Sequence, residues 1–485
     1  MSLGQKTLSG FIWTFISTIG KKFSALIVGI VLARLLTPEA FGLVAMLYIF
    51  FEISQSFVNS GFSQALIREK ELSEEDKSTT FFVNVIFSIL FYTVLWIVAP
   101  YIAEFYEQPI LTDLTRFMGL NILIQAPTIV QSATFTQQLR FKELSFINIA
   151  ADVGSGIVAV LLAFAGFGVW ALAVKYILST FISTAALWLL NPWKPTFFLV
   201  KESFTRLFGF GSKLLATGLL NNAFGNIYKI VIGKVFSASI LGFYTQGQMF
   251  VQNITQGAIG TLESVTYPIL SKTNGDSERL KQAYRKIILA SSYVIFPSTI
   301  GLALVAEPMI LTLVGEQWLP TVPFLQILCV SGALYHLHSI NLNVLKVVGR
   351  SDLFLKLAVI KKINISIAVI IGLQFGILGL LVAKVISSYV ALYINMYYTK
   401  RFIDYSFGEQ LKDLLPVIVH AIPMALGVGM LTYYLDITHY YKLFLSILSG
   451  VILYLSTTLY LKSESLVYIK NLLEVRMPIL KKYSI

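Results

Sequence analysis

The chain alternates long apolar runs with short polar segments along nearly its whole length. A membrane-spanning helix needs about 20 consecutive, mostly apolar residues. The pattern predicts fourteen spanning helices, over residues 10–35, 40–66, 80–103, 113–138, 144–166, 168–190, 207–233, 239–269, 286–306, 320–345, 353–374, 376–399, 413–435 and 441–461. Very tight turns, around Gly166–Gly168 and Phe375–Gly376, join the fifth helix to the sixth and the eleventh to the twelfth. The segments between helices do not exceed about 20 residues, so no separate soluble domain is expected.

Composition supports a membrane protein. Of the 485 residues, 56% are apolar and only 13% are charged, and the mean hydropathy is +0.75. A soluble protein carries about 25% charged residues, so this balance indicates an all-α polytopic membrane protein. The single cysteine, Cys329, excludes an internal disulfide. No cleavable signal peptide is expected, because no A-x-A cleavage site follows the first apolar run.

The positive charges lie mainly on one side of the predicted topology. Lys and Arg are enriched in the cytoplasmic loops of membrane proteins. With both termini in the cytoplasm, 25 of the 37 Lys and Arg residues fall in cytoplasmic segments, and three, Arg34, Lys234 and Lys442, fall on the other side. The distribution of Lys and Arg therefore predicts a multi-pass protein with both termini cytoplasmic. It also accounts for most of the net charge of +12 without a nucleic-acid partner.

Two pairs of segments indicate an internal repeat. "ARLLTPEAFGL" (33–43) aligns with "GKVFSASILGF" (233–243) at an offset of 200, which places Arg34 on Lys234 and Gly42 on Gly242. "FGVWALAVKYILSTF" (167–181) aligns with "FGILGLLVAKVISSY" (375–389) at an offset of 208. Such weak symmetry is typical of two-lobed transporters, although chance similarity of apolar segments is the alternative. We predict an N-terminal lobe over 1–200 (spans 1–6), a C-terminal lobe over 201–402 (spans 7–12), and 403–485 holding spans 13–14 and a cytoplasmic tail. The lobes would be parallel repeats, because each contains an even number of spans.

Two adjacent lysines, Lys21 and Lys22, interrupt the first span about 17 Å along its helix at 1.5 Å per residue. A lysine at the centre of a span costs about 3 kcal/mol on insertion scales. On a helical wheel the pair joins Thr14, Ser17 and Thr18 in one polar stripe. Such a stripe must face water, an anion or a carboxylate.

Cations outnumber acids inside the predicted spans. The further lysines are Lys175, Lys229, Lys361, Lys362 and Lys384, and the acids well within spans are Glu52, Asp152 and Glu263. The excess predicts a hydrated, cationic central cavity that attracts an anionic substrate. Two alternatives stay open, namely a structural pairing of the lysine pair with Asp152 or Glu52, and snorkelling of Lys229 and Lys361 to the headgroups. The three acids are candidates for carrying a coupling proton or sodium ion.

Amide side chains follow the same helices. The candidates for contact with a glycan are Gln55 and Asn59 in the second span, Gln125 in the fourth, and Gln252, Asn253 and Gln256 in the eighth. Amides suit a hydroxyl-rich ligand, but they also commonly join helices to one another.

No enzyme site is apparent. A phosphate-binding loop of the G-x-x-x-x-G-K-[ST] type is absent from the sequence, which argues against ATP hydrolysis. His336 and His338 are two residues apart and point to different faces of a helix, so we expect no metal pair there. The sequence therefore predicts neither a catalytic activity nor a cofactor.

The first two spans resemble a known family. The stretch "SGFIWTFISTIGKKFSALIVGIVLARLLTPEAFGLVAM" is similar to the start of bacterial Wzx-type polysaccharide transporters, the flippases of O-antigen and exopolysaccharide repeat units. The most specific positions are Gly10, Trp13, Leu32–Leu36, Pro38, Phe41, Gly42 and Leu43. The resemblance extends over nearly the whole chain in span number and length. It identifies the superfamily, that of multidrug, oligosaccharidyl-lipid and polysaccharide exporters, but not the glycan.

The resemblance implies an alternating-access flippase of the bacterial inner membrane. Its substrate would be an undecaprenyl-diphosphate-linked oligosaccharide, with the diphosphate in the cationic cavity of Lys21, Lys22, Lys175, Lys229, Lys361, Lys362 and Lys384. An ion gradient would drive the cycle, and spans 13 and 14 would border a groove for the lipid tail. Membrane lipids and polysaccharide polymerase or assembly proteins are the other expected partners. The alternatives are a cation-coupled multidrug exporter, a lipid II-type flippase, and a non-transporting scaffold for polysaccharide assembly.

Overall fold

The computed structural model describes residues 20, 22–59, 61–68, 73–191, 193–197, 199–272, 275–461, 463 and 466, with side chains throughout except at 210, 213, 214, 256–265, 267–269, 272 and 351. It divides into an N-terminal unit, Met1–Thr245, and a C-terminal unit, Gln246–Ile485. All regular structure in the described residues is helical, and eight helices are long and apolar enough to cross a membrane. The predicted all-α, polytopic membrane fold is confirmed. The number of fourteen spans and the symmetry of two lobes stay predictions.

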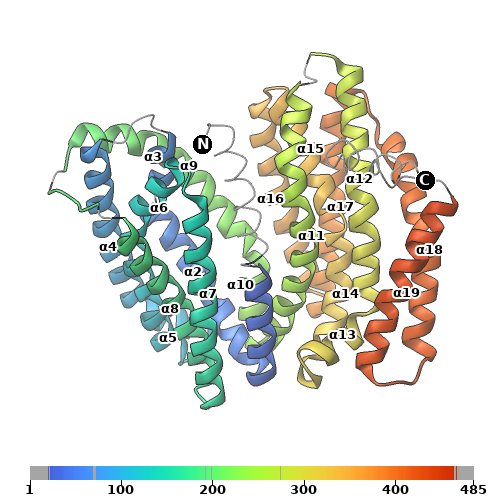
Figure 1. Ribbon diagram of the computed structural model, residues 1–485, viewed down its shortest axis with the longest axis horizontal. Helices are drawn as coiled ribbons and strands as arrows, with labels where there is room; N and C mark the ends of the chain where they lie inside the picture. The colour runs from blue at the N-terminus through green and yellow to red at the C-terminus, as the bar shows by residue number, and fades with distance from the viewer. Residues whose placement is uncertain are drawn as a thin grey trace. The chain divides into compact units, whose positions relative to one another are not determined.

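The N-terminal unit begins with a helix over residues 22–35. The following helices are α2 (Pro38–Asn59), α3 (Phe62–Arg68), α4 (Glu74–Tyr106), α5 (Leu111–Gln125), α6 (Thr128–Gln137), α7 (Phe141–Phe164), α8 (Val169–Leu190), α9 (Lys201–Gly225), α10 (Ile227–Val235) and the start of α11 (Ala238–Lys272). Helices α4 and α5 form one antiparallel hairpin and α7 and α8 another (Figure 1). Helix α2 packs against α4, α5, α8 and α9, so it lies at the centre of this unit.

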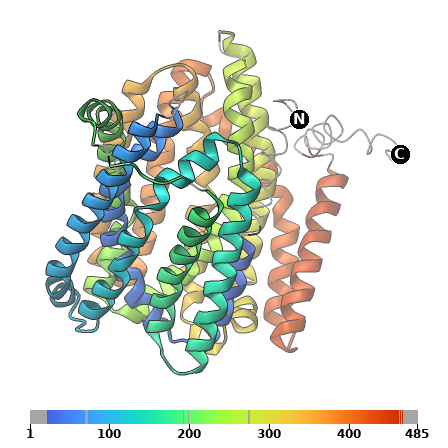
Figure 2. The same cartoon turned by 60° about the vertical axis from the view of Figure 1, so that its left-hand side comes forward.

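The C-terminal unit contains the rest of α11 and the helices α12 (Ser277–Leu304), α13 (Ala306–Leu313), α14 (Thr321–Gly332), α15 (Tyr335–Val347), α16 (Ser351–Leu373), α17 (Gly376–Ile403), α18 (Phe407–Tyr434) and α19 (His439–Tyr460), with a 3₁₀ turn at Glu316–Trp318. Helices α16 and α17 form a hairpin. The last two, drawn in red in Figure 2, run side by side as a second hairpin, and α18 packs on α12. Leu280, Tyr284, Leu337 and Leu414 belong to a core that joins α12, α15 and α18.

The two tight turns predicted from the sequence are confirmed. Helix α7 ends at Phe164 and α8 begins at Val169, with Gly166 and Gly168 at φ values of +83° and +55°. Between α16 and α17, Gly376 has a φ of +71°. Only glycine adopts this backbone region without a steric penalty, which explains why such short connections are possible here.

Four predicted spans consist of two consecutive helices each. The ranges 40–66, 113–138, 207–233 and 320–345 correspond to α2 and α3, α5 and α6, α9 and α10, and α14 and α15. Pro127 separates α5 from α6, because proline has no N–H to continue the helix. Asn226 separates α9 from α10. Both α9 and α10 contact α2 and α4 within the N-terminal unit, while the predicted lobe boundaries at 200 and 402 stay a prediction.

Candidate functional site

The central acid of the N-terminal unit is held by the break between α9 and α10. Glu52, half-buried in α2, accepts a 2.6 Å hydrogen bond from the Nδ2 of Asn226, which is buried at the break. One turn further along α2, Ser56 Oγ accepts a 2.9 Å hydrogen bond from the Nδ2 of Asn222. The helix break therefore supplies amide donors to the polar stripe of α2. The sequence analysis selected Glu52 but missed Asn226, although an asparagine within an apolar run is a recognisable signal.

The second acid, Asp152, is buried in α7 and accepts a 2.7 Å hydrogen bond from Ser24 Oγ of the first helix. Lys175 of α8 lies within electrostatic reach of the same carboxylate. Lys22, two residues before Ser24, is half-buried, and among the described side chains it makes no ion pair with Asp152 or Glu52. Lys21 lies outside the described residues.

The C-terminal unit contributes a lysine beside a histidine. Lys361 of α16 is half-buried and within electrostatic reach of His338 on α15. The two ring nitrogens of His338 lie 3.1 Å from Ser388 Oγ and 3.1 Å from Asn395 Nδ2, both on α17. Nearby in the same hairpin, Asn364 Nδ2 donates 2.8 Å hydrogen bonds to the backbone and side-chain oxygens of Ser387. Lys361 thus lies near a histidine whose own hydrogen-bond partners are neutral side chains of α17.

Lys362 and Lys384 are half-buried in the same hairpin, as is Lys229 in α10. Measured from the turn between α16 and α17, Lys361 lies about 20 Å and Lys384 about 14 Å along their helices at 1.5 Å per residue. The backbone positions of the two lysines along their helices therefore differ by about one helical turn.

The predicted glycan contacts occupy varied environments. Gln55, Asn59, Gln125 and Asn253 are half-buried, and Gln252 is exposed. The side chains of Gln256 and of the third acid, Glu263, lie outside the described part of the chain. Whether these residues contact a ligand stays a prediction.

Two apolar pockets border α18 in the C-terminal unit. One, of about 410 Å³, lies between α12, α14, α15, α17 and α18 and is lined by Phe296, Leu337 and Leu411 among others. The second, of about 640 Å³, lies between α11, α12, α13, α18 and α19, and includes Pro297, Met424 and Tyr454. Both pockets are lined mainly by apolar side chains, so they are suited to hold a hydrocarbon chain.

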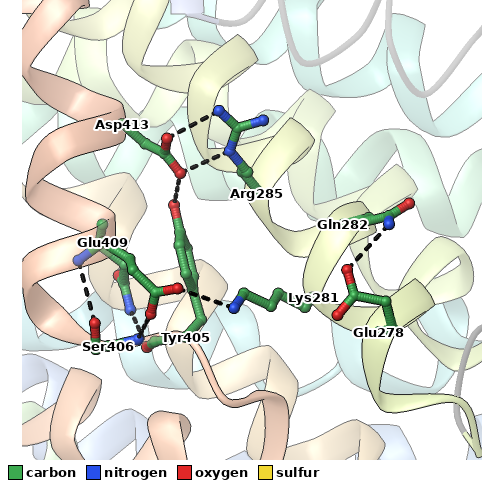
Figure 3. A network of polar contacts seen from close by, with 9 residues as sticks. Glu278, Lys281, Gln282, Arg285, Tyr405, Ser406, Glu409 and Asp413 are labelled. Atoms are coloured by element: carbon green, nitrogen blue, oxygen red, sulfur yellow. Dashed lines mark hydrogen bonds and ion pairs between the residues drawn. The ribbon is translucent and has the colours of Figure 1, made fainter.

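A network of charges fastens α18 to α12 at one end of this region (Figure 3). Arg285 donates to both carboxylate oxygens of Asp413, at 2.6 and 2.8 Å, and the Tyr405 hydroxyl donates to the same carboxylate. Lys281 contacts Glu409 at 3.0 Å, and Glu409 also completes a capping box with Ser406 at the start of α18. Burial raises the pKa of Tyr405, and its hydrogen bond to Asp413 raises that pKa further.

One ion pair in the N-terminal unit joins α10 to the residue that follows α4. Lys234 Nζ at the end of α10 is 2.8 Å from Glu107 Oε1, just after α4. The hydrogen bond from Lys234, together with its positive charge, holds the pKa of Glu107 below its ordinary value. Glu107 was not singled out from the sequence, because nothing local marks an exposed acid after a helix as half of a long-range pair.

The comparisons with known proteins agree on one family and one fold. The model for polysaccharide biosynthesis proteins matches residues 31–323. The Bacillus subtilis teichuronic acid biosynthesis protein TuaB is 28% identical over 355 residues, which is 73% of each chain. The Escherichia coli lipopolysaccharide biosynthesis protein WzxC is 24% identical over 446 residues, 88% of this chain and 89% of WzxC.

Solved structures show the same fold at low identity. The lipid II flippase MurJ in an inward closed conformation has a TM-score of 0.74 and 15% identity, over 94% of this chain and 99% of MurJ. An inward-facing multidrug resistance MATE transporter of the MOP superfamily has a TM-score of 0.61 and 16% identity, over 79% of this chain and 94% of that one. The resemblance inferred from the first two spans is confirmed. The chain is a multi-pass membrane protein that belongs to the polysaccharide biosynthesis protein family.

Proposed function

We propose that the protein is a flippase that moves an undecaprenyl-diphosphate-linked oligosaccharide repeat unit across the bacterial cytoplasmic membrane for the synthesis of a surface polysaccharide. The loaded lipid enters from the cytoplasmic leaflet and leaves into the outer leaflet by alternating access. Family membership and the names of relatives such as WzxC support a role in polysaccharide export. The charge bias of the loops supports an orientation with both termini in the cytoplasm.

The observation that carries this proposal is the set of half-buried ammonium groups within apolar helices of both units. Lys22, Lys175 and Lys361 are half-buried, and a charged group buried in a low-dielectric region is costly unless it is paired. Asn226 and Ser24 donate hydrogen bonds to the two described acids without changing their charge, and Asp152 lies within electrostatic reach of Lys175, so these acids offset only part of the positive charge. A diphosphate would supply the negative charge and several hydrogen-bond acceptors.

The remaining parts of the substrate fit other features. In this proposal the sugars contact amides such as Gln55, Asn59 and Gln125, and the polyprenyl chain lies in the two apolar pockets beside α18, whose lining is hydrocarbon in character. Glu52 and Asp152 carry the coupling proton or sodium ion. The proposal requires no catalytic step and no cofactor.

The direct test combines loss of the protein with loss of charge. Cells lacking the chain should accumulate the lipid-linked repeat unit on the cytoplasmic side and lose surface polysaccharide. A chain with both Lys21→Ala and Lys22→Ala should fail to restore export, whereas Lys356→Ala, an exposed lysine of α16, should restore it. Undiminished surface polysaccharide from the double variant at normal protein level would contradict the role of these lysines.

The likeness to MurJ favours a second candidate of the same chemistry, a lipid II-type flippase. Both kinds of flippase would transport a polyprenyl diphosphate, so the positive charge of the cavity does not distinguish between the two candidate functions. Rescue of growth in cells depleted of their own lipid II flippase would support the second candidate. A multidrug exporter fits less well, because a net positive interior repels the cationic compounds that it would carry.

A further inference from the structure

A third pocket in the C-terminal unit differs in chemistry from the two apolar pockets. It has a volume of about 520 Å³ and lies where the end of α12, the helices α13 and α14, and the turn between α18 and α19 come together. Figure 1 shows α13 and the α18–α19 turn at the same end of this unit. The lining includes Glu307 of α13, Gln326 of α14, and His439 and Lys442 of α19. Carboxylate, amide, imidazole and ammonium groups thus share one cavity, which indicates a ligand with a polar part.

The two opposite charges of this pocket are not paired with each other. Lys442 is half-buried, and its Nζ donates a 3.2 Å hydrogen bond to the backbone oxygen of Thr432 at the end of α18. Glu307 is exposed, and within the described part of the chain it forms no ion pair. A ligand that carries both a negative and a positive group would complement both side chains at once.

The pocket lies beside a surface suited to lipid. Ile422, Leu426 and Met430 are 48%, 59% and 60% exposed and follow one another at four-residue spacing on α18. The stripe continues to Tyr433, which lines the pocket and is 82% exposed, and Tyr434 beside it is 78% exposed. Tyrosine is enriched at the membrane–water interface. The polar pocket therefore lies between an apolar stripe and interfacial tyrosines, where phospholipid headgroups are expected.

Helix α18 is fastened to its neighbours differently at its two ends. Near its start, Glu409 and Asp413 form ion pairs with Lys281 and Arg285 of α12. At the other end of α18, no ion pair to α12 or α13 is present among the residues that the structure describes. The charges of Glu307 on α13 and Lys442 on α19 lie at this second end, so a ligand that binds both would join the hairpin to α13.

We propose that this pocket binds the headgroup of a zwitterionic, ethanolamine-type phospholipid, with its phosphate on Lys442 and its ammonium on Glu307. The acyl chains lie along the apolar stripe of α18, and the bound lipid fastens the α18–α19 hairpin at the end that lacks ion pairs. With both termini in the cytoplasm, the lipid belongs to the outer leaflet. An anionic headgroup without an ammonium fits less well, because Glu307 repels it. The site is separate from the proposed cargo cavity and does not depend on the proposed function.

A saccharide is the alternative occupant, because amide, hydroxyl and carboxylate groups also bind hydroxyl-rich ligands. The apolar stripe that leads into the pocket favours the lipid, since a saccharide has no chain to place there. The two occupants are distinguished by the test.

The test titrates the purified, detergent-solubilised full chain with single phospholipids and follows its thermal unfolding. Phosphatidylethanolamine should raise the unfolding midpoint at lower concentrations than phosphatidylglycerol or phosphatidylcholine. Lys442→Gln should raise the phosphatidylethanolamine concentration for half of this stabilisation about fivefold, as expected for a partly exposed ion pair. Glu307→Gln should instead abolish the preference for phosphatidylethanolamine over phosphatidylglycerol, because the repulsion of anionic headgroups is lost.

Two matched controls remove the same charges outside the pocket. Lys412→Gln changes an exposed lysine near the start of α18, and Glu316→Gln changes an exposed acid in the 3₁₀ turn. Both should respond to each lipid as the unmodified chain does. The unfolding midpoint without lipid shows whether each variant is folded. Since the two pocket variants make different predictions, either one that folds tests the site.

A water-soluble headgroup identifies what is recognised. Glycerophosphoethanolamine should compete with phosphatidylethanolamine for the unmodified chain and compete less well for Lys442→Gln. Equal stabilisation of the pocket variants and the controls by phosphatidylethanolamine, with the lipid preference unchanged, would place lipid binding elsewhere and overturn the proposal. Stabilisation by N-acetylglucosamine that Lys442→Gln and Glu307→Gln abolish, without a preference among phospholipids, would overturn it in favour of a saccharide site.

Discussion

The two units differ in how their intramembrane charges are accommodated. In the N-terminal unit, Glu52 and Asp152 lie deep in helices, where Asn226 and Ser24 donate hydrogen bonds to them, and Lys175 lies near Asp152. Acids and cations are therefore mixed in this unit. Most of their interactions are local to the protein and would exist without any ligand.

In the C-terminal unit, the described acids lie toward helix ends. Asp413 is in the network that fastens α18 to α12, and Asp352 is beside Arg350 at the start of α16. Lys361, by contrast, lies within electrostatic reach of His338, whose ring nitrogens contact the hydroxyl of Ser388 and the amide of Asn395. Under the proposed function we therefore expect a division of labour, in which Lys361 of the C-terminal unit contributes more to the attraction for an anionic cargo and the acids of the N-terminal unit serve in ion coupling.

The largest expected effect is at Lys361. We predict that Lys361→Gln lowers the rate of polysaccharide export about tenfold or more, because a hydrogen bond to a charged group contributes about 1.5–3 kcal/mol. Export is measured as the surface polysaccharide formed after induction at matched protein level. Lys356→Gln, an exposed lysine on the same helix, is the matched control and should be close to the unmodified chain. Equal losses in both variants would indicate a general effect on α16.

The next effect concerns coupling through Glu52. Glu52→Gln keeps an oxygen to accept the hydrogen bond from Asn226 but removes the negative charge and the ability to bind a proton or sodium ion. We predict an export rate about fivefold lower. The neutral amide accepts a weaker hydrogen bond from Asn226 than the carboxylate does, since charge-assisted hydrogen bonds are about twice as strong as neutral ones. Export should also lose its dependence on the ion gradient. The measurement is transport in vesicles with imposed proton and sodium gradients. If transport by the variant still depends on a gradient, Glu52 takes no part in coupling.

A smaller effect, on stability, is expected at Asp413. Asp413→Ala leaves Arg285 and Tyr405 without their shared acceptor and should lower the free energy of unfolding by about 0.5–1 kcal/mol, since these groups are partly exposed. Thermal unfolding of the detergent-solubilised protein is the measurement. Asp352→Ala is the control. Hydrogen bonds from Arg350 lower the pKa of Asp352 to about 2, but that pair joins residues two apart and fastens no second helix. An equal loss in the control would mean that Asp413 does not hold α18 to α12.

Much of the fold was predictable because it follows from local rules. A helix that crosses the membrane needs a long apolar run, which the sequence shows directly. The turns at Gly166, Gly168 and Gly376 need positive φ values, which glycine adopts readily. The breaks inside spans were less predictable, because Asn226 ends α9 in a context where its side chain is paired with Glu52, 174 positions away.

The site was predictable as a set of residue types but not as a set of contacts. Glu52, Asp152 and the lysines were selected because they lie well inside predicted spans. It did not select Ser24, which lies 128 positions from Asp152 in the chain, or His338, which the sequence suggested only as a poor metal ligand. Partners across helices depend on how helices are rotated and packed, and a single sequence does not encode that rotation in any short pattern.

The smallest expected effect is at Lys175, and it is the sharpest check on the difference between the units. Lys175→Gln removes a cation whose charge Asp152 already partly balances, so Lys175 contributes less to the attraction for the cargo than Lys361 does. Asp152 keeps its hydrogen bond from Ser24. We predict a loss of export of about twofold, in the range of a single screened ion pair, measured beside Lys361→Gln in the same assay. If the two losses are equal, the cargo draws on both units alike and the proposed division of labour fails.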